Sequence, residues 1–223
     1  MPGEATRRFR LHGSDYFSTL LMPPLAALVG ADAPGVVLHL IDRPGPPEAQ
    51  LADPGADLAF DIARPVPDWL LRETLFRSHL VGVAARGHPD LASVAPGTAV
   101  PAEILVRLRH GIVAGDGATR GTLDAALEAR GLSRRVVLTL PHFHAMALAA
   151  ADGGLFVALP RHFAAAVAPR LGLALYRLPV PEPSVEVAMY WHARLAEDPA
   201  SHWLRAKVRE ACAGLAADPV NER

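Results

Sequence analysis

Apolar and polar residues alternate along the chain in two periods, one typical of strands and one typical of helices. Near the N-terminus, a short strand over Phe9–His12 leads through Gly13 into a segment whose apolar residues recur every three or four positions, as they do on one face of a helix. Pro23 and Pro24 are expected to interrupt this helix, because proline lacks an amide hydrogen and clashes with the preceding turn. This strand-to-helix turn is the segment around which the remaining elements are arranged.

The alternation of strand and helix continues along the rest of the sequence. Predicted strands, many of them continuous apolar runs typical of buried parallel strands, cover Val36–Ile41, Ala56–Ile62, His110–Ala114, Val136–Leu140, Leu155–Leu159, Leu173–Leu178 and Val185–His192. Predicted helices cover Pro47–Asp53, Thr122–Arg130, His142–Ala151, Pro160–Val167 and Pro199–Ala217. Residues Leu71–Ala85 are predicted to form two strands joined by a turn near Arg77–Ser78. This order predicts an α/β fold with two Rossmann-like lobes, each built on a parallel sheet.

Composition narrows the class of protein further. Hydrophobic residues make up 51% of the 223 residues, enough for a sizeable core, and the formal net charge of -1 gives no electrostatic reason to bind nucleic acid directly. Cys212 is the only cysteine, which excludes an internal disulfide and a cysteine metal cluster. The first residues lack the apolar segment of a signal peptide, and no apolar run approaches the ~20 residues of a membrane span. We therefore expect a cytoplasmic protein with no membrane partner.

The turn after the first predicted strand carries candidate binding residues. Ser14 and Asp15 are preferred N-cap residues, and either side chain could accept a hydrogen bond from the free amides of the next turn. A helix start at the carboxyl end of a strand is also a suitable place for an anion or a carboxylate. The alternative is an ordinary strand-to-helix turn in which Asp15 serves only as a cap.

Motifs for catalysis, nucleotide binding and metal binding have little support. The sequence contains no Gly-x-Ser-x-Gly elbow, no His-Glu-x-x-His and no phosphate-loop ending of Lys followed by Ser or Thr. His142 and His144 have a spacing that could bind a metal, but residues two apart on a helix point to different sides. We expect no enzymatic activity, no cofactor and no metal.

Several short motifs, in order, resemble the effector-binding domain of LysR-type transcriptional regulators. They are found at Phe9–Tyr16, Leu21–Leu25, Ala33–Val36, Ala56–Ala59, Gly87–Leu91 and Val157–Pro160. The segments Pro141–Phe143, Tyr190–Arg194 and Asp198–Arg205 resemble the branch that holds nodulation-gene and salicylate-responsive or nitroaromatic-responsive regulators. Each motif alone has low specificity, and their ordered combination from Arg8 to about Leu215 carries the resemblance.

The resemblance implies a fold like that of type II periplasmic binding proteins, with crossover strands between the lobes. Lobe I is expected over residues 8–85 and 185–223, and lobe II over residues 86–184. Family members carry an N-terminal winged helix-turn-helix domain, and these 223 residues do not include one. We therefore expect DNA to be contacted only through a helix-turn-helix domain that is not part of this sequence, and we expect a homodimer.

The resemblance also implies where a small-molecule effector binds. Ligands of such folds lie at the carboxyl ends of strands, in the crevice between lobes. A carboxylate or nitro group is expected at the first helix, and an aromatic ring could stack on Phe143 beside the His142 imidazole. Arg43 could pair with a carboxylate. The alternatives are that Arg43 is a solvated surface residue and that His142 only occupies a helix cap. The predicted ligand-binding residues are Ser14, Asp15, Tyr16, Arg43, Asp61, Pro141, His142 and Phe143.

The expected function is that of the effector-sensing domain of a LysR-type transcriptional regulator. The ligand is expected to be a small molecule such as an aromatic carboxylate or a flavonoid-like phenol, and its binding is expected to shift the relative orientation of the lobes. One alternative is a stand-alone solute-binding protein of the same fold. A second alternative is an enzyme on this fold, which would need a set of acid and base residues that the sequence does not offer.

Overall fold

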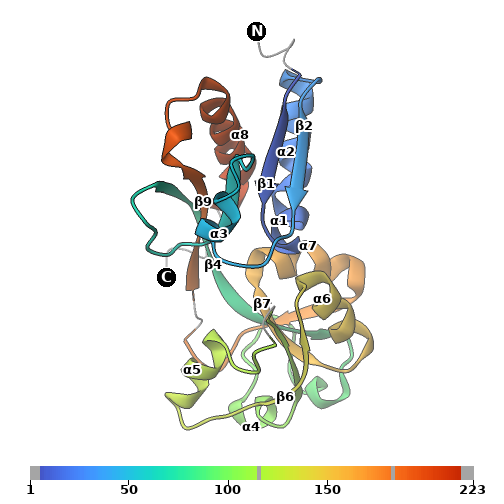
Figure 1. The fold of residues 1–223 in the computed structure, drawn as a ribbon. Helices are drawn as coiled ribbons and strands as arrows, with labels where there is room; N and C mark the ends of the chain where they lie inside the picture. Colours follow the sequence, from blue (N-terminus) through green and yellow to red (C-terminus); the bar gives the residue numbers. More distant parts are fainter. Residues whose placement is uncertain (1–5, 115–116, 182–183, 217–223) are drawn as a thin grey trace. The chain divides into compact units, whose positions relative to one another are not determined.

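A computed structural model describes residues 6–114, 117–181 and 184–216 (Figure 1). The chain divides into two compact units. Unit 1 comprises Met1–Arg77 and Val185–Arg223, and unit 2 comprises Ser78–Ser184. Strands β4 (Leu70–Ala85) and β9 (Ser184–His192) each contribute residues to both units, so the chain passes between the units within regular strands.

Unit 1 is built on a mixed sheet. Its strands lie in the order β2-β1-β3-β9-β4, with β1 parallel to both β2 and β3 and with β9 antiparallel to β3. Besides β4 and β9, its elements are β1 (Arg8–His12), α1 (Asp15–Leu20), α2 (Met22–Asp32), β2 (Val37–Ile41), α3 (Pro47–Leu51), β3 (Leu58–Ile62), the short 3-10 helix η3 (Ala193–Leu195) and α8 (Pro199–Ala216).

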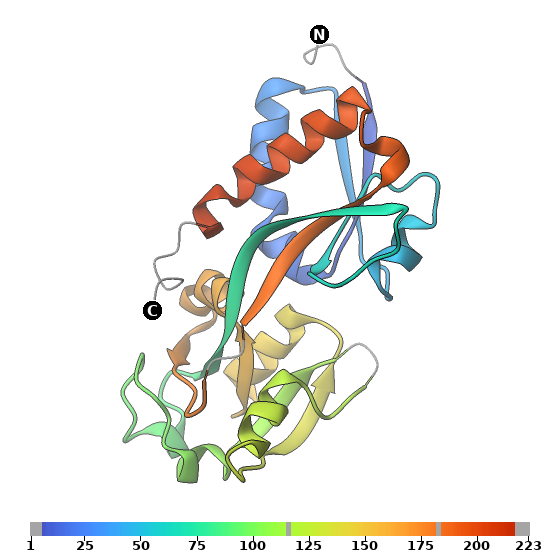
Figure 2. The same cartoon turned by 90° about the vertical axis from the view of Figure 1, so that its left-hand side faces the viewer.

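The alternation of residues along β1 decides which helices cover each face of this sheet. Phe9 is buried and its ring stacks on Trp203 of α8 at 6.1 Å, so this face is covered by α8 and by α2, which contacts α8 (Figure 2). Arg10 points to the other face, where its guanidinium lies 2.8 Å from Asp53, two residues beyond α3. A second buried cluster fills that face between α3 and the sheet and contains Leu51, Ala56, Ala59, Leu70, Ala188 and Tyr190.

The first predicted helix is divided, as the prolines predict. Helix α1 ends at Leu20 and helix α2 begins at Met22. Pro23 and Pro24 therefore lie in the first turn of α2, where a missing amide hydrogen costs nothing. Helical backbone hydrogen bonds continue at Leu21, whose amide donates to the Phe17 carbonyl oxygen at 2.9 Å and whose carbonyl oxygen accepts from the Leu25 amide at 3.0 Å.

The prediction of two strands over Leu71–Ala85 is wrong. Residues Leu70–Ala85 form one 16-residue strand, β4, with no turn near Arg77–Ser78. Around Arg77–Ser78, from Glu73 to Val81, the sequence contains no Gly, Pro, Asn or Asp residue that would favour a turn. Its polar residues instead have partners across the strands, since Arg77 pairs with Glu186 of β9 at 2.7 Å, while Ser78 is buried.

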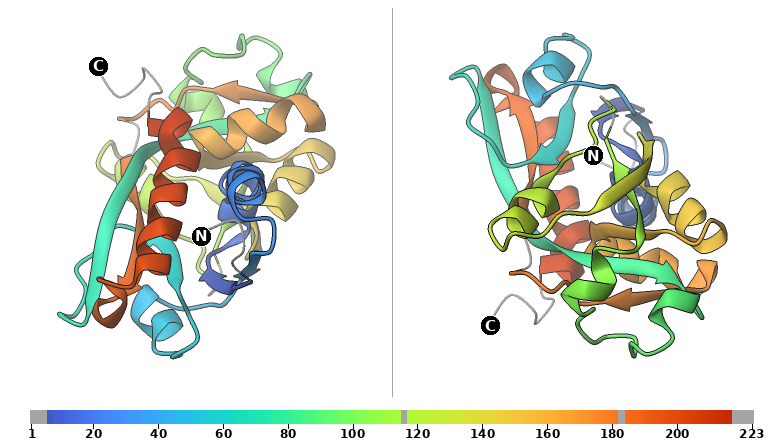
Figure 3. Two further views of the ribbon diagram at one scale, coloured as in Figure 1. Left: turned by 90° about the horizontal axis from the view of Figure 1, so that it is seen from above. Right: turned by 90° about the horizontal axis from the view of Figure 1, so that it is seen from below.

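Unit 2 has a sheet in the order β4-β7-β5-β6, with β8 paired to β4. Strand β5 is parallel to β6 and β7, and both β7 and β8 are antiparallel to β4. Besides β4, its elements are η2 (Pro89–Leu91), α4 (Ala102–Leu105), β5 (Arg109–Val113), α5 (Thr122–Glu128), β6 (Arg135–Leu140), α6 (Phe143–Asp152), β7 (Phe156–Pro160), α7 (Arg161–Leu171) and β8 (Leu173–Tyr176). Helices α6 and α7 are in contact and both pack on β7 (Figure 3).

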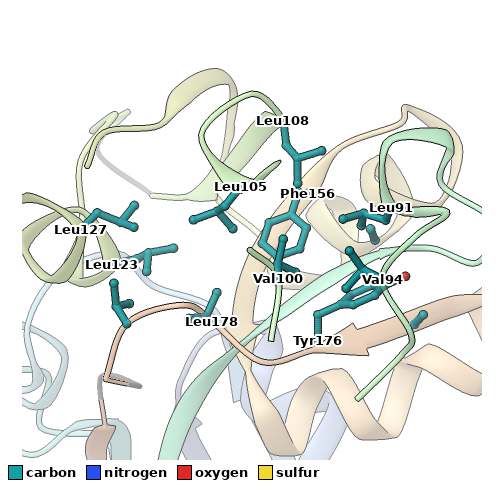
Figure 4. Close-up of a cluster of buried hydrophobic side chains, with 13 residues drawn as sticks. Leu91, Val94, Val100, Leu105, Leu108, Leu123, Leu127, Phe156, Tyr176 and Leu178 are labelled. Atoms are coloured by element: carbon teal, nitrogen blue, oxygen red, sulfur yellow. The ribbon is translucent and has the colours of Figure 1, made fainter. Parts of the chain in front are cut away.

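The opposite face of this sheet holds the main buried cluster of unit 2. Phe156 lies in the middle of it, among leucines of α4 and α5 and beside Tyr176 at 6.3 Å (Figure 4). Gly82 of β4 makes this packing possible, because a Cβ atom added there would overlap the Phe156 ring. The absence of a side chain at residue 82 is therefore a packing requirement, independent of backbone conformation.

We predict that Gly82→Ala destabilises unit 2. The added methyl group forces the Phe156 ring or the strand to move, and such overpacking costs about 1–3 kcal/mol in the free energy of unfolding. Urea denaturation measures this change. Gly214→Ala is the matched control, because a Cβ atom on that exposed residue of α8 meets nothing within 4 Å. The control should leave stability unchanged or raise it by up to about 1 kcal/mol, and equal losses in both variants would contradict the prediction.

Candidate functional site

In unit 1, the carboxyl ends of three parallel strands bring predicted residues to one edge. Strand β1 is parallel to both β2 and β3, and the pairing extends to the last residue of β1. Ser14 follows β1, Arg43 follows β2, and Asp61 is the penultimate residue of β3. We call Ser14, Arg43 and Asp61 the unit-1 edge.

Ser14 occupies the N-cap of α1, but its hydroxyl group does not cap the helix. Its backbone is extended and its side chain makes no capping hydrogen bond, so the expectation that this hydroxyl accepts a hydrogen bond from the next turn is wrong. Its carbonyl oxygen accepts a hydrogen bond from the Phe17 amide at 3.0 Å. The half-buried hydroxyl of Ser14 is therefore not committed to holding the helix start.

Asp15 and Tyr16 begin helix α1 and face different surroundings. Asp15 lies in the first turn, where a negative charge is favourable to the helix dipole, and its carbonyl oxygen accepts hydrogen bonds from the hydroxyl groups of Ser18 and Thr19. Tyr16 is buried, and its ring packs edge-on against Phe17 at 5.1 Å. Tyr16 thus contributes packing to unit 1.

The two arginines near this edge differ in their charge partners. Arg64 lies 2.6 Å from the Asp61 carboxylate, and its backbone amide donates to the Tyr190 hydroxyl at 3.0 Å. Burial raises the pKa of the Asp61 carboxyl, and the Ile62 amide and the Arg64 guanidinium act in the opposite direction. Arg43 is exposed, and within the described residues no carboxylate lies within ion-pair distance of it. Arg43 is therefore the cation of this edge that is available to an anion.

His12, which the sequence did not single out, is a buried polar residue next to the unit-1 edge. Its side chain is 1% exposed, and neither ring nitrogen has a hydrogen-bond partner in the described protein atoms. Burial lowers the pKa of His12, and the nearby Arg10 and Arg43 lower it further. Strand alternation places His12 on the side of Arg10, but only the fold shows that α3 and its flanking loops cover this side.

In unit 2, the carboxyl end of β6 carries the second set of predicted residues. Pro141 and His142 are exposed, and His142 occupies the N-cap of α6 without a side-chain capping bond. The ring of Phe143 packs against Phe163 of α7 at 5.6 Å. We call Pro141, His142 and Phe143 the unit-2 edge, and it offers an imidazole beside a fixed aromatic ring.

Two further polar residues of unit 2 lie at the same end of its sheet, where strand β7 also ends. His162, in the first turn of α7, has Nδ1 at 3.3 Å from the Ser78 hydroxyl of β4. Ser78 is buried. The sequence did not indicate this pair, because Ser78 was assigned to a turn that does not exist and His162 follows β7 by only two residues.

Two further features concern metal-ligating side chains and the cysteine thiol. In the part of the chain that the structure describes, no three His, Cys, Asp or Glu side chains come together in a way that could hold a metal ion. Burial raises the pKa of the Cys212 thiol to about 12, so the thiol is protonated at neutral pH. None of the helices in the described ranges has the length and hydropathy needed to cross a membrane.

Comparison with known sequences shows what the chain is similar to. The family model described as LysR substrate binding domain matches residues 2–213. The HTH-type transcriptional activator NagR of Ralstonia sp is 27% identical over 92% of this chain and 66% of its own length. The HTH-type transcriptional activator NahR of Pseudomonas putida is 25% identical over 92% of this chain and 67% of its own length. Nodulation protein D 1 of Bradyrhizobium diazoefficiens is 24% identical over 97% of this chain and 68% of its own length. The chain thus spans about two thirds of the length of these relatives.

Solved structures with the same fold include further regulators. A putative transcriptional regulator from Vibrio parahaemolyticus has a TM-score of 0.84 at 28% identity, over 97% of this chain and 100% of that one. A probable transcriptional regulator from Pseudomonas aeruginosa has a TM-score of 0.81 at 31% identity, over 94% of this chain and 68% of that one. These likenesses confirm the predicted fold class.

The unpartnered imidazole of His12 predicts how stability depends on pH. Its pKa in the folded protein lies below the ordinary value of 6.5, so the unfolded chain takes up the proton at a higher pH than the folded chain does. The stability that neutral His12 contributes to the folded protein is complete above pH 6.5. It is lost as pH falls through 6.5 toward the pKa of His12 in the folded state. We expect the free energy of unfolding to fall less between about pH 7.5 and about pH 5.5 in His12→Leu than in the wild type, as measured by urea denaturation.

At the higher pH, His12→Leu should change stability little, because no hydrogen bond is lost with the ring. His202→Leu on the exposed surface of α8 is the control. An unchanged difference between the two pH values in His12→Leu would show that another group carries the dependence.

Proposed function

The chain belongs to the LysR substrate-binding domain family, and on this basis we propose that it senses a small-molecule effector within a transcriptional regulator. The observation that carries this proposal is the family match over residues 2–213, together with relatives that are named as transcriptional activators. The fold is the α/β fold of type II periplasmic binding proteins. Its relatives are regulators by name, so no enzymatic reaction is proposed for it.

We propose the unit-1 edge and the unit-2 edge as the effector-binding residues of their respective units. The unit-1 edge offers the Ser14 hydroxyl and the unpaired Arg43, and the unit-2 edge offers the His142 imidazole and the Phe143 ring. Asp15, Tyr16, Asp61 and Pro141 lie within or next to these edges. A ligand that binds one conformation of the protein more tightly than another shifts the equilibrium between them.

The chemistry of these residues favours an aromatic carboxylate. A guanidinium group binds a carboxylate through charge-assisted hydrogen bonds. The Phe143 ring, held against Phe163 at 5.6 Å, offers an apolar face for a second ring. Asp61 is already paired with Arg64, so its negative charge is largely compensated and opposes an anionic ligand only weakly.

We also propose that the regulator is a cytoplasmic homodimer that contacts DNA through a helix-turn-helix domain outside these residues. The net charge of -1 supports a separate DNA-binding part. One surface suited to a second copy is a groove between β6 and α6 of unit 2, where Leu148 is 46% exposed. The groove is lined by Arg109, Val137, Leu138, Leu148, Ala149, Asp152, Gly153 and Leu155.

Aromatic carboxylates should raise the melting temperature of the protein, because a ligand that binds only the folded state stabilises it by mass action. A thermal-shift series with benzoate, phenylacetate and cinnamate measures this effect. His142→Ala should weaken the Kd by about tenfold or more, the value of a hydrogen bond to a charged group. His202→Ala, at an exposed position of α8, is the control, and equal shifts in both variants would remove His142 from the site.

A charge in the groove between β6 and α6 should weaken self-association. Leu148→Glu places a carboxylate where an apolar contact is proposed, and burying that charge without a partner is unfavourable. Analytical ultracentrifugation measures the dimer dissociation constant. Leu71→Glu, which changes a 37% exposed leucine of β4, is the matched control. A dimer that resists Leu148→Glu but not Leu71→Glu would place the interface elsewhere.

A further inference from the structure

The loop between β2 and α3 is held by one buried side chain, Gln50. Its Nε2 atom donates a hydrogen bond to the Arg43 carbonyl oxygen at 2.8 Å and another to the Gly45 carbonyl oxygen at 2.9 Å. The side chain belongs to α3 and is 5% exposed. Both amide hydrogens of Gln50 are thus used on the loop that leads into its own helix.

This loop depends on those bonds for a defined shape. Gly45 has a φ of 112°, a conformation that residues with a side chain rarely adopt. Pro44 and Pro46 lack amide hydrogens, so few backbone donors remain to fix the loop from within. The Gln50 Oε1 atom has no hydrogen-bond partner in the described protein atoms, and the buried amide is therefore present for its two donated bonds.

The loop carries the cation of the unit-1 edge. Arg43 is exposed, and its guanidinium has no ion-pair partner within the described residues, whereas Arg64 at the same edge is held by Asp61 at 2.6 Å. A free arginine has many rotamers, and fixing its backbone reduces the number of positions that its guanidinium can reach. Anchoring the Arg43 carbonyl is therefore a means of directing its charge.

We propose that Gln50 is a positioning residue that acts through Arg43, and that Arg43 binds the carboxylate end of the effector. This role rests on the proposed function, in that it assigns the anionic end of the ligand to one residue of unit 1. Gln50 does not touch the ligand. A purely structural role, in which Gln50 only stabilises the fold, predicts lower stability with no specific effect on anion binding.

The first experiment needs no ligand. Hydrogen–deuterium exchange of the peptide covering residues 41–50 is compared in the wild type, Gln50→Ala and Gln50→Met. Methionine nearly conserves the volume of glutamine but donates no hydrogen bond, so it separates packing from hydrogen bonding. Faster exchange in both variants, with unchanged exchange in unit 2, is the expected result. Unchanged exchange in Gln50→Met would overturn the positioning role.

The second experiment is a double-mutant cycle on binding of benzoate, phenylacetate and cinnamate, with benzamide as the neutral control. Arg43→Ala is expected to weaken carboxylate binding about tenfold and Gln50→Met about fivefold. The double variant should lose about tenfold, because Gln50 has no effect once Arg43 is absent. Benzamide should respond little to either substitution.

The outcomes separate this role from the proposed function. Losses that multiply to about fiftyfold in the double variant, or equal losses for benzamide, would overturn the action through Arg43. Failure of all three carboxylates to bind the wild type would contradict the proposed aromatic-acid effector and, with it, the assignment of Arg43. In that case the exchange experiment still decides whether Gln50 fixes the loop.

Discussion

The parallel pairing of β1 with β2 and β3 is the interaction on which the candidate site of unit 1 depends. Five consecutive residue pairs join β1 to β2, and the last residue of β1 is also paired with β3. Because parallel strands end at the same edge of a sheet, residues separated by about 30 and 50 positions in the chain come to one place. The Ser14 turn, the Arg43 loop and Asp61 follow from that pairing, and so does the buried position of His12.

Charge compensation then decides which of these residues is open to a ligand. Many arginines of unit 1 are committed, since Arg7 pairs with Asp57 and Asp198 and Arg64 pairs with Asp61. Arg43 differs because none of the carboxylates in the described residues lies within ion-pair distance of it. Its loop is fixed instead through backbone carbonyl groups. Whether an arginine can bind an anionic ligand therefore depends on its position and on whether a carboxylate of the protein already forms an ion pair with it.

Much of the fold could be predicted, because apolar periodicity and proline positions report local structure directly. The split of the first helix at Leu21 and the strands β1, β2 and β3 follow from those signals. The prediction failed at β4, where a polar stretch in a 16-residue strand looks like a break. Those polar residues are stable in a strand because β9 supplies Glu186 to Arg77, a partner more than 100 residues away. Because Ser78 was assigned to this incorrect turn, the sequence offered no indication of its side-chain contact with His162.

The sequence by itself determined the family, the order of the elements and the segments that carry Ser14, Arg43 and His142, because these depend on local pattern and on short ordered motifs. Tertiary structure decided which side chains are committed and which are not. It left the Ser14 hydroxyl without a capping role, paired Asp61 with Arg64, buried His12 without a partner and fixed the Arg43 loop through Gln50. Burial and hydrogen bonding between distant segments depend on packing in three dimensions, and a linear pattern does not encode them residue by residue.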